Sequence, residues 1–181
     1  MKAIIGLGNP GKKYVNTRHN AGYLLIDVLI HKCEGSVKTD VKPFAEISHV
    51  VLMSQKILVV RPTTFMNESG KAAKIVMDKY GIKDLNDICI VHDDLDLTLG
   101  NYKIQKGKGP KVHNGVASVE STIGKDFWRI RIGVDNRDPD SFVKGESYVL
   151  QAFSNEEKPI LEVLYGKIIE SFELTTVLGL D

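Results

Sequence analysis

The stretch Lys2-Ala3-Ile4-Ile5-Gly6-Leu7 opens the chain with a short apolar run that ends in glycines, a pattern typical of a buried β-strand. From Gly8 to Arg18 the sequence is polar and lacks helical spacing, so we expect a long exposed loop. Asn20 then stands where it can cap a helix. In that helix the apolar residues recur at helical spacing, at Leu24, Leu25, Val28 and Leu29. A strand followed by a helix points to an α/β fold.

The same alternation continues along the chain. We expect further strands at Glu46–Leu52, Lys56–Val60, Ile88–His92, Asn101–Lys106 and Phe127–Val134. We expect further helices at Ser69–Tyr80, from Asn114 as a cap, and after the capping box Ser154-Asn155-Glu156-Glu157. In the last strand, apolar residues alternate with Arg129 and Arg131. The pattern predicts one α/β domain over residues 1–181, with a mixed twisted sheet and helices on both faces.

Composition limits the class of protein. Of the 181 residues, 43% are hydrophobic and 26% are charged, so a full core can be buried and disordered or fibrous classes are excluded. The formal net charge of +1 neither requires nor excludes a nucleic-acid partner. Cys33 and Cys89 stand far apart, which favours reduced thiols over a disulfide framework or a cysteine zinc site. We expect a cytoplasmic protein, because no signal-peptide run opens the chain and Ala21–Ile30 is too short to cross a bilayer.

The first glycine-rich motif, Gly6-Leu7-Gly8-Asn9-Pro10-Gly11, formally matches the dinucleotide fingerprint G-x-G-x-x-G. A helix with an apolar stripe should follow directly, but the next residues carry none. The acidic residue expected about 20 positions later would be Asp27, which lies inside the predicted helix. A nucleotide-binding oxidoreductase is therefore rejected.

A histidine and a carboxylate cluster are the first candidates for chemistry. His19 shares a loop-rich region with Asn9, and histidine accepts a proton near neutral pH, although a lone histidine at a helix start is often only structural. Asp93, Asp94 and Asp96 follow an apolar strand. Three interpretations stay open: a divalent metal site, a carboxylate that orients a histidine, or a turn. Asp93 suits the histidine, and Asp96 suits the turn.

The stretch Pro62-Thr63-Thr64-Phe65-Met66-Asn67-Glu68-Ser69-Gly70 is a candidate for substrate contacts. Asn67 can cap the following helix, or its carboxamide can bind a carbonyl oxygen and a water molecule. An exposed Phe65-Met66 pair would offer an apolar surface to a nucleobase, sugar or side chain. Both residues are equally compatible with the core.

The stretch Gly100–Val119 carries lysines at 103, 106, 108 and 111 and has no acidic residue. A charge run is usually a solvated face. Lysines that lead into a helix N-terminus are also suited to clamp phosphates, and Arg131 could extend the clamp. This local concentration is the main sign of a nucleic-acid partner.

Several blocks together resemble bacterial-type peptidyl-tRNA hydrolases. They are the first glycine motif with Tyr14 and Thr17-Arg18-His19-Asn20-x-Gly22; Pro62-x-Thr64-Phe65-Met66-Asn67-x-Ser69-Gly70; His92-Asp93-Asp94-Leu95-Asp96-x-x-x-Gly100; His113-Asn114-Gly115; Phe127-x-Arg129-x-Arg131-Ile132-Gly133; and Tyr148-Val149-Leu150. The resemblance spans nearly the whole chain. It implies a hydrolase that uses a histidine-activated water to cleave the ester between a peptide and the 3′ ribose of tRNA.

The resemblance also implies roles for single residues. His19 corresponds to the general base, and Asp93 to the carboxylate that favours its protonated form. The substrate-binding residues would be Asn9, Tyr14, Phe65, Asn67 and Asn114, with Asn9 sensing the peptide bond. The tRNA-binding residues would be Lys103 and Arg131, with Lys106, Lys108 and Lys111 of the basic stretch added to them. His113 is assigned a supporting role. The family implies a monomer without metal or other cofactor, whose partner is peptidyl-tRNA.

The chain departs from the family pattern before His113. The family loop is usually a near-continuous glycine run, whereas this chain has Gly107-Lys108-Gly109-Pro110-Lys111-Val112, and Gln105 replaces a frequent lysine. We expect a stiffer loop with two added charges and a rearranged phosphate clamp. Two alternatives stay open: a non-catalytic RNA-binding relative, and a metal-dependent phosphoesterase built on the three aspartates.

Overall fold

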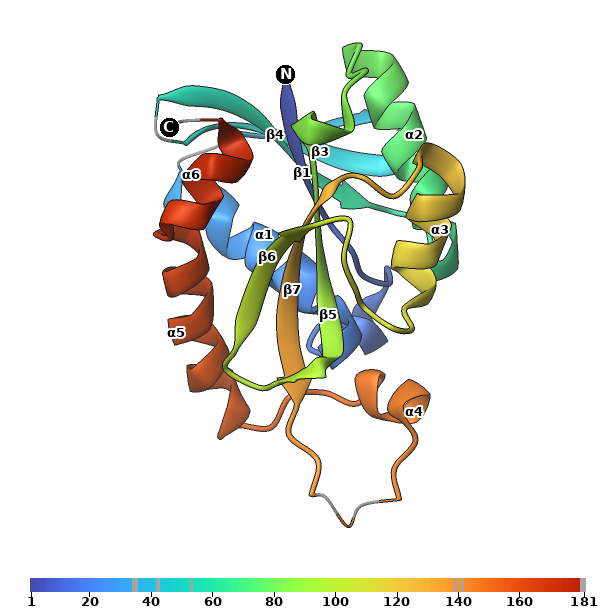
Figure 1. Ribbon diagram of the computed structural model, residues 1–181, viewed down its shortest axis with the longest axis vertical. Helices are drawn as coiled ribbons and strands as arrows, with labels where there is room; N and C mark the ends of the chain where they lie inside the picture. Colours follow the sequence, from blue (N-terminus) through green and yellow to red (C-terminus); the bar gives the residue numbers. More distant parts are fainter. Residues whose placement is uncertain (34–35, 42, 53, 139, 141, 180–181) are drawn as a thin grey trace.

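The computed structural model describes residues 1–33, 36–41, 43–52, 54–138, 140 and 142–179, and in them seven strands form one twisted sheet (Figure 1). The sheet order is β2-β3-β4-β1-β5-β7-β6. The central strands β4, β1, β5 and β7 are parallel, while β2, β3 and β6 pair antiparallel with their neighbours. The strands are β1 (Lys2–Gly6), β2 (Ser36–Val41), β3 (Ala45–Leu52), β4 (Gln55–Pro62), β5 (Ile88–Thr98), β6 (Tyr102–Lys106) and β7 (Trp128–Asp135). The predicted mixed sheet is confirmed, although β2 was not predicted.

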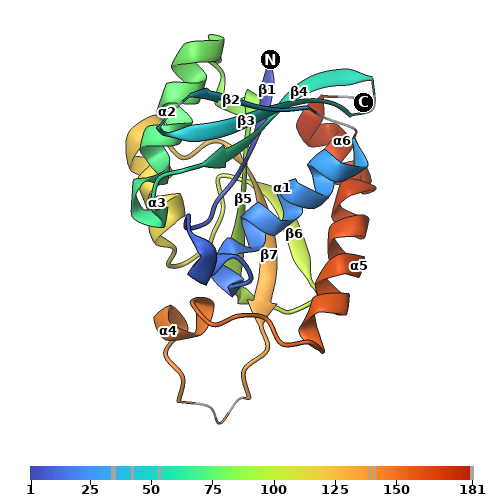
Figure 2. The ribbon, with the colours of Figure 1, turned by 180° about the vertical axis from the view of Figure 1, so that it is seen from behind.

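Helices cover both faces of the sheet, as predicted (Figure 2). One buried apolar cluster joins the sheet to α1 (Ala21–Lys32), α5 (Glu157–Ile169) and α6 (Phe172–Leu178). A second cluster joins the opposite face to α2 (Ser69–Tyr80) and α3 (Asn114–Ile123). The short helix α4 (Gly145–Val149) lies beyond the end of β7 (Figure 1). In the part of the chain described here, no helix is both long and apolar enough to cross a membrane.

Two glycines let α1 begin directly against the sheet. A Cβ atom at Gly22 would collide with backbone atoms of Leu7 and Val91, and one at Gly6 would collide with the Gly22 carbonyl group. A side chain at either position would push the helix away from β1 and β5. This close approach brings the residues just before α1, including His19, next to β5.

The exposed loop predicted for Gly8–Arg18 is confirmed only in its middle: residues 11–13, 15 and 16 are exposed, but both ends are buried. Thr17 and Arg18 are buried, and Arg18 pairs with a carboxylate of α5. Asn20 stands at the N-cap position of α1, as predicted, but its side chain makes no capping hydrogen bond to the helix. Its side chain accepts from the Asn9 N–H (2.8 Å) and donates to the Asn9 carbonyl oxygen (3.0 Å), so it fixes the first glycine-rich loop instead.

Strands β5 and β7 are more buried than their sequences indicate. β5 continues to Thr98 instead of ending at His92, so Asp93 and Asp94 lie inside the strand. β7 is flanked by β5 and β6, and both Arg129 and Arg131 are buried despite the alternating pattern. Each arginine is neutralised by an acidic partner, which lets it occupy a buried position.

Candidate active site

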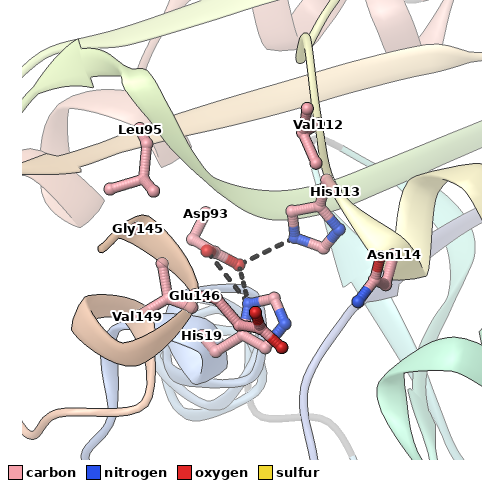
Figure 3. A pocket seen from close by; sticks show the side chains of 9 residues that line it. All are labelled: His19, Asp93, Leu95, Val112, His113, Asn114, Gly145, Glu146 and Val149. Atoms are coloured by element: carbon pink, nitrogen blue, oxygen red, sulfur yellow. Dashed lines mark hydrogen bonds and ion pairs between the residues drawn. The ribbon is translucent and has the colours of Figure 1, made fainter.

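His19, Asp93 and His113 come together at one end of the sheet (Figure 3). His19 lies in a 3₁₀ turn before α1, Asp93 in β5, and His113 just before α3. The His19 Nδ1 atom lies 2.9 and 3.0 Å from the two Asp93 carboxylate oxygens, and His113 Nε2 lies 2.8 Å from Oδ1. Asp93 is only 2% exposed. The buried Asp93 carboxylate therefore forms hydrogen bonds with two imidazole rings.

The hydrogen bonds fix which nitrogen of His19 is reactive. An ionised carboxylate has only acceptor atoms, so the Nδ1 atom that faces Asp93 must carry a hydrogen and donate it. In the neutral ring the remaining nitrogen, Nε2, then keeps its lone pair. His19 is thus oriented as a base whose acceptor atom is directed away from Asp93.

The charges of the site shift two pKa values in the directions that a base requires. Burial alone would raise the pKa of Asp93, but the His19 and His113 rings and their hydrogen bonds hold it well below its usual range. Burial alone would lower the pKa of His19, but the Asp93 charge and hydrogen bond outweigh it and raise the pKa. Asp93 therefore stays ionised and stabilises the protonated form of His19.

An open cavity of about 370 Å³ lies in front of these side chains (Figure 3). Its walls come from the 3₁₀ turn before α1, β5, the loop before α3, the start of α3, and α4. The lining residues are His19, Asp93, Leu95, Val112, His113, Asn114, Gly145, Glu146 and Val149. The cavity is large enough to admit a small ligand or one end of a larger one.

Comparison with known proteins identifies the family of this site. The family model described as peptidyl-tRNA hydrolase matches residues 3–181. The chain belongs to the peptidyl-tRNA hydrolase family. It is accordingly a hydrolase that cleaves the ester bond of peptidyl-tRNA.

Individual relatives agree with this assignment. A peptidyl-tRNA hydrolase from Rickettsia bellii (strain RML369-C) is 41% identical over 174 residues, which cover 96% of this chain and 92% of the relative. One from Desulfitobacterium hafniense (strain Y51) is 36% identical over 184 residues, covering 100% and 96%. The crystal structure of peptidyl-tRNA hydrolase from Acinetobacter baumannii superposes with a TM-score of 0.88 at 30% identity, covering 99% of this chain and 89% of that chain.

Of the predicted substrate-binding residues of this family member, only some lie at the cavity. Asn114 lines the cavity. Asn9 is buried, and its Oδ1 atom accepts from the Met66 N–H (2.9 Å), which leaves its amide nitrogen as the remaining donor. Phe65 is 53% exposed, but Met66 is buried in the core, so the two residues do not form one apolar surface and each of the two open interpretations holds for only one of them.

Tyr14 and Asn67 lie outside the set of residues that line the cavity. Tyr14 is half-buried in a 3₁₀ turn at Lys12–Tyr14. Asn67 is exposed in the turn Met66–Glu68, and it provides no cap for α2. The cavity wall instead includes Glu146 and Val149 of α4, which were not predicted as site residues. The only signal for that segment was the family block Tyr148-Val149-Leu150.

The three neighbouring aspartates do not form a joint metal site. Asp94 accepts from Arg131 Nε (2.7 Å) and from the Asp96 N–H (2.8 Å), while Asp96 accepts from the Lys111 N–H (3.1 Å). Asp93 and Asp94 are consecutive in a strand and therefore point to opposite faces. The phosphoesterase alternative loses its basis, since these carboxylates do not converge.

His19, Asp93 and His113 also fit a divalent cation poorly, although their candidate ligand atoms lie within 4.8 Å of one another. The His113 Nδ1 atom accepts hydrogen bonds from the Gly115 and Val116 N–H groups. A cation on Nε2 would require the hydrogen to move to Nδ1, where it would face those two donors. The hydrogen-bond pattern thus suits a proton-bearing histidine and not a metal ligand.

The basic residues separate into two groups. Lys103 and Lys106 on β6 and Lys108 and Lys111 in the following loop are exposed, as a phosphate-binding surface requires. Arg131 is only 8% exposed, and its guanidinium group donates to Asp94 and to Gln105 Oε1 (2.8 Å). Asp94 neutralises Arg131 beneath the loop, and the role of Arg131 as a direct tRNA ligand stays a prediction.

The start of α3 also differs from the sequence interpretation. His113, and not Asn114, caps the helix. The N–H groups of Gly115 and Val116 bond to the His113 ring, so these donors are not available for a phosphate. Any phosphate clamp here depends on the lysines.

A buried ion pair anchors the segment that carries His19. Arg18 donates to both carboxylate oxygens of Glu157 at the start of α5 (2.8 and 2.7 Å). The same guanidinium group lies over the rings of Tyr148 in α4 and Phe153. Glu157 also accepts from the Ser154 N–H (2.8 Å), as the predicted capping box requires. This cluster ties the residue next to His19 to α4 and α5.

Proposed function

We propose that His19 is the general base of this peptidyl-tRNA hydrolase and that Asp93 orients it and stabilises its charge. The single observation that supports this proposal is the geometry of His19, whose Nδ1 atom donates to a buried carboxylate while the ring lines an open cavity. Histidine bases positioned in this way contribute about 10²–10⁴-fold to reaction rates. The arrangement resembles the histidine–carboxylate pair of hydrolytic triads, with water in place of a serine.

The reaction follows from these positions. His19 Nε2 takes a proton from a water molecule whose oxygen attacks the ester carbonyl carbon, and Asp93 stabilises the imidazolium ion that forms. When the tetrahedral intermediate collapses, the bond to the 3′ oxygen of the ribose breaks, and the imidazolium proton passes to that oxygen. The products are a free peptide carboxyl group and tRNA. Asn114 in the cavity wall, and Asn9 through its free amide nitrogen, would bind the peptidyl-adenosine end.

The decisive experiment compares N-acetyl-aminoacyl-tRNA with the same aminoacyl-tRNA left unblocked. We expect rapid release of N-acetyl amino acid and tRNA from the first substrate and little cleavage of the second. Activity should persist in a strong chelator, because the proposed base needs no metal. Cleavage of neither substrate, with retained RNA binding, would favour the non-catalytic RNA-binding alternative.

We also propose that the exposed lysines at 103, 106, 108 and 111 bind tRNA phosphates. Phosphate contacts release counterions, so affinity falls as salt rises, with roughly one unit of logarithmic slope for each contact. We expect a Lys108→Ala/Lys111→Ala variant to bind tRNA more weakly and to lose one to two units of that slope. Binding titrations at several salt concentrations measure both effects.

A matched control for this variant is available in the same chain. Lys56, at the amino end of β4, and Lys83, in the connection from α2 to β5, are also exposed and do not line the cavity. A Lys56→Ala/Lys83→Ala variant removes the same charge but should leave the salt slope unchanged. Equal slopes for both variants would mean that the lysines act only through net charge and not as a clamp.

We further propose that residues 1–181 act as one domain, as a monomer, in the cytoplasm. The single sheet, which carries an apolar cluster on each face, supports one domain, and the free cysteines Cys33 and Cys89 fit the reducing conditions of the cytoplasm. Light scattering on the purified chain tests the monomer, and a dimer mass that persists on dilution would overturn it.

A further inference from the structure

His113 is held through both of its ring nitrogens. Its Nδ1 atom accepts from the backbone N–H groups of Gly115 (3.1 Å) and Val116 (3.2 Å) in the first turn of α3. Its Nε2 atom lies 2.8 Å from Asp93 Oδ1. The side chain is buried. The ring therefore spans the distance between the helix and the carboxylate.

These contacts fix the position of the His113 hydrogen. Nδ1 faces two donors and must offer a lone pair, so the hydrogen of the neutral ring is on Nε2 and is donated to Asp93. A second hydrogen on Nδ1 would be directed at two N–H groups, which disfavours the imidazolium form. His113 is thus a fixed neutral donor and is not oriented to act as a second base.

We propose that His113 is a positioning residue: α3 locks its ring in the Nε2–H form, which holds the Asp93 carboxylate and moderates the charge that Asp93 presents to His19. This inference rests on the proposed role of His19 as the base. Asp93 Oδ1 receives hydrogen bonds from both rings, so the two rings share the charge on that oxygen. Without the His113 donor, the full charge would act on His19, stabilise its protonated form and raise its pKa.

The other titratable and charged groups around this pair do not replace His113. His92 packs against the His113 ring at 5.1 Å between centroids, and burial lowers the pKa of His92 to about 3, so it stays neutral. Burial and then the Asp93 charge raise the pKa of Tyr165 in α5 above its usual range, so it too stays neutral. Asp94 and Arg131 neutralise each other. Glu146 of α4 lines the same cavity but is exposed.

The first test reads the hydrogen position without using catalysis. Nitrogen-15 NMR of the histidine rings distinguishes protonated from unprotonated Nδ1 and Nε2 atoms. We expect His113 to keep Nε2 protonated and Nδ1 unprotonated on both sides of the His19 titration. A hydrogen on Nδ1, or a His113 ring that titrates together with His19, would overturn the proposal. Neither result bears on whether the chain hydrolyses peptidyl-tRNA.

The second test uses His113→Asn, with His113→Ala as its comparison. Asparagine is a good helix cap, so His113→Asn should keep α3 while its shorter side chain leaves Asp93 without the donor. We expect the acid limb of the kcat/KM profile, which reports the free-enzyme base, to move up by about one pH unit. His113→Ala should show the same shift together with a lower Tm, because it also loses the cap.

The pH profile distinguishes a positioning role of His113 from a purely structural role and from a role as a base. An equal loss of activity at every pH, without movement of the limb, would mean that His113 is only structural and would overturn the proposal. Disappearance of a limb would mean that His113 itself titrates as a base, and this would overturn it too. Absence of turnover in the unmodified chain would refute the proposed function instead, and the NMR result would still stand.

Discussion

Replacement of His19 by alanine is expected to lower kcat by about 10²–10⁴-fold, the contribution of a positioned general base. The imidazole ring is the group whose free nitrogen can take a proton from water, and alanine offers none. The loss should appear in kcat more than in KM, because the base acts on the reacting water and not on tRNA binding. Steady-state hydrolysis of N-acetyl-aminoacyl-tRNA, with a separate tRNA-binding titration, measures the two effects.

A second histidine provides the control for this variant. His31 is exposed in the last turn of α1, so His31→Ala removes an imidazole ring without touching the cavity. We expect His31→Ala to keep near wild-type turnover, and His19→Ala to keep wild-type tRNA affinity and a similar Tm. Turnover of His19→Ala close to that of His31→Ala would remove His19 from the mechanism.

Replacement of Glu157 by alanine should destabilise the fold by about 3–5 kcal/mol, since removal of one partner leaves the other charge buried. Arg18 is 6% exposed and Glu157 4% exposed, so water cannot readily replace the lost carboxylate. Glu157 also accepts from Asn136 Nδ2 (3.2 Å), which would lose this partner as well. Urea unfolding followed by circular dichroism measures the change in the free energy of unfolding.

The same helix offers a matched control for the ion pair. Glu162 is an exposed glutamate of α5, and Glu162→Ala should change the free energy of unfolding by no more than about 0.5 kcal/mol. Burial would raise the pKa of Glu157, but its hydrogen bonds to Ser154, Arg18 and Asn136 lower it overall. Its contribution is therefore present above the ordinary glutamate pKa and is lost as pH falls. Equal stabilities of the two variants at neutral pH would show that the pair contributes little.

The sheet could be predicted from the sequence because its signals are local. Apolar runs such as Ile88–His92 alternate with helical patterns such as Ser69–Tyr80, and this order alone indicates an α/β domain. The resemblance to a family then identified His19 and Asp93 as a pair, although they are 74 residues apart. The structure places them in hydrogen-bond contact, which composition and spacing cannot establish.

The errors arose where a distant partner decides the role of a polar side chain. Asp94 resembled part of a turn or metal site, but Arg131 on the neighbouring strand binds it inside β5. Asn20 and Asn114 had the usual features of helix caps, yet Asn20 fixes the Asn9 backbone and His113 caps α3. Local patterns list the groups that a side chain can bind, but only tertiary contacts determine which one it binds.

The capping of α3 by His113 separates the groups proposed for catalysis from those proposed for RNA binding. Two amide groups in the first turn of this helix, those of Gly115 and Val116, donate to the His113 ring and not to a phosphate. The proposed catalytic residues therefore share no donor with the exposed lysines that would bind the RNA. The affinity for RNA can therefore change, through substitution of lysines in the loop, without a change in the acid–base chemistry of His19 and Asp93. Changes at Lys108 and Lys111 should therefore alter RNA affinity at little cost to catalysis.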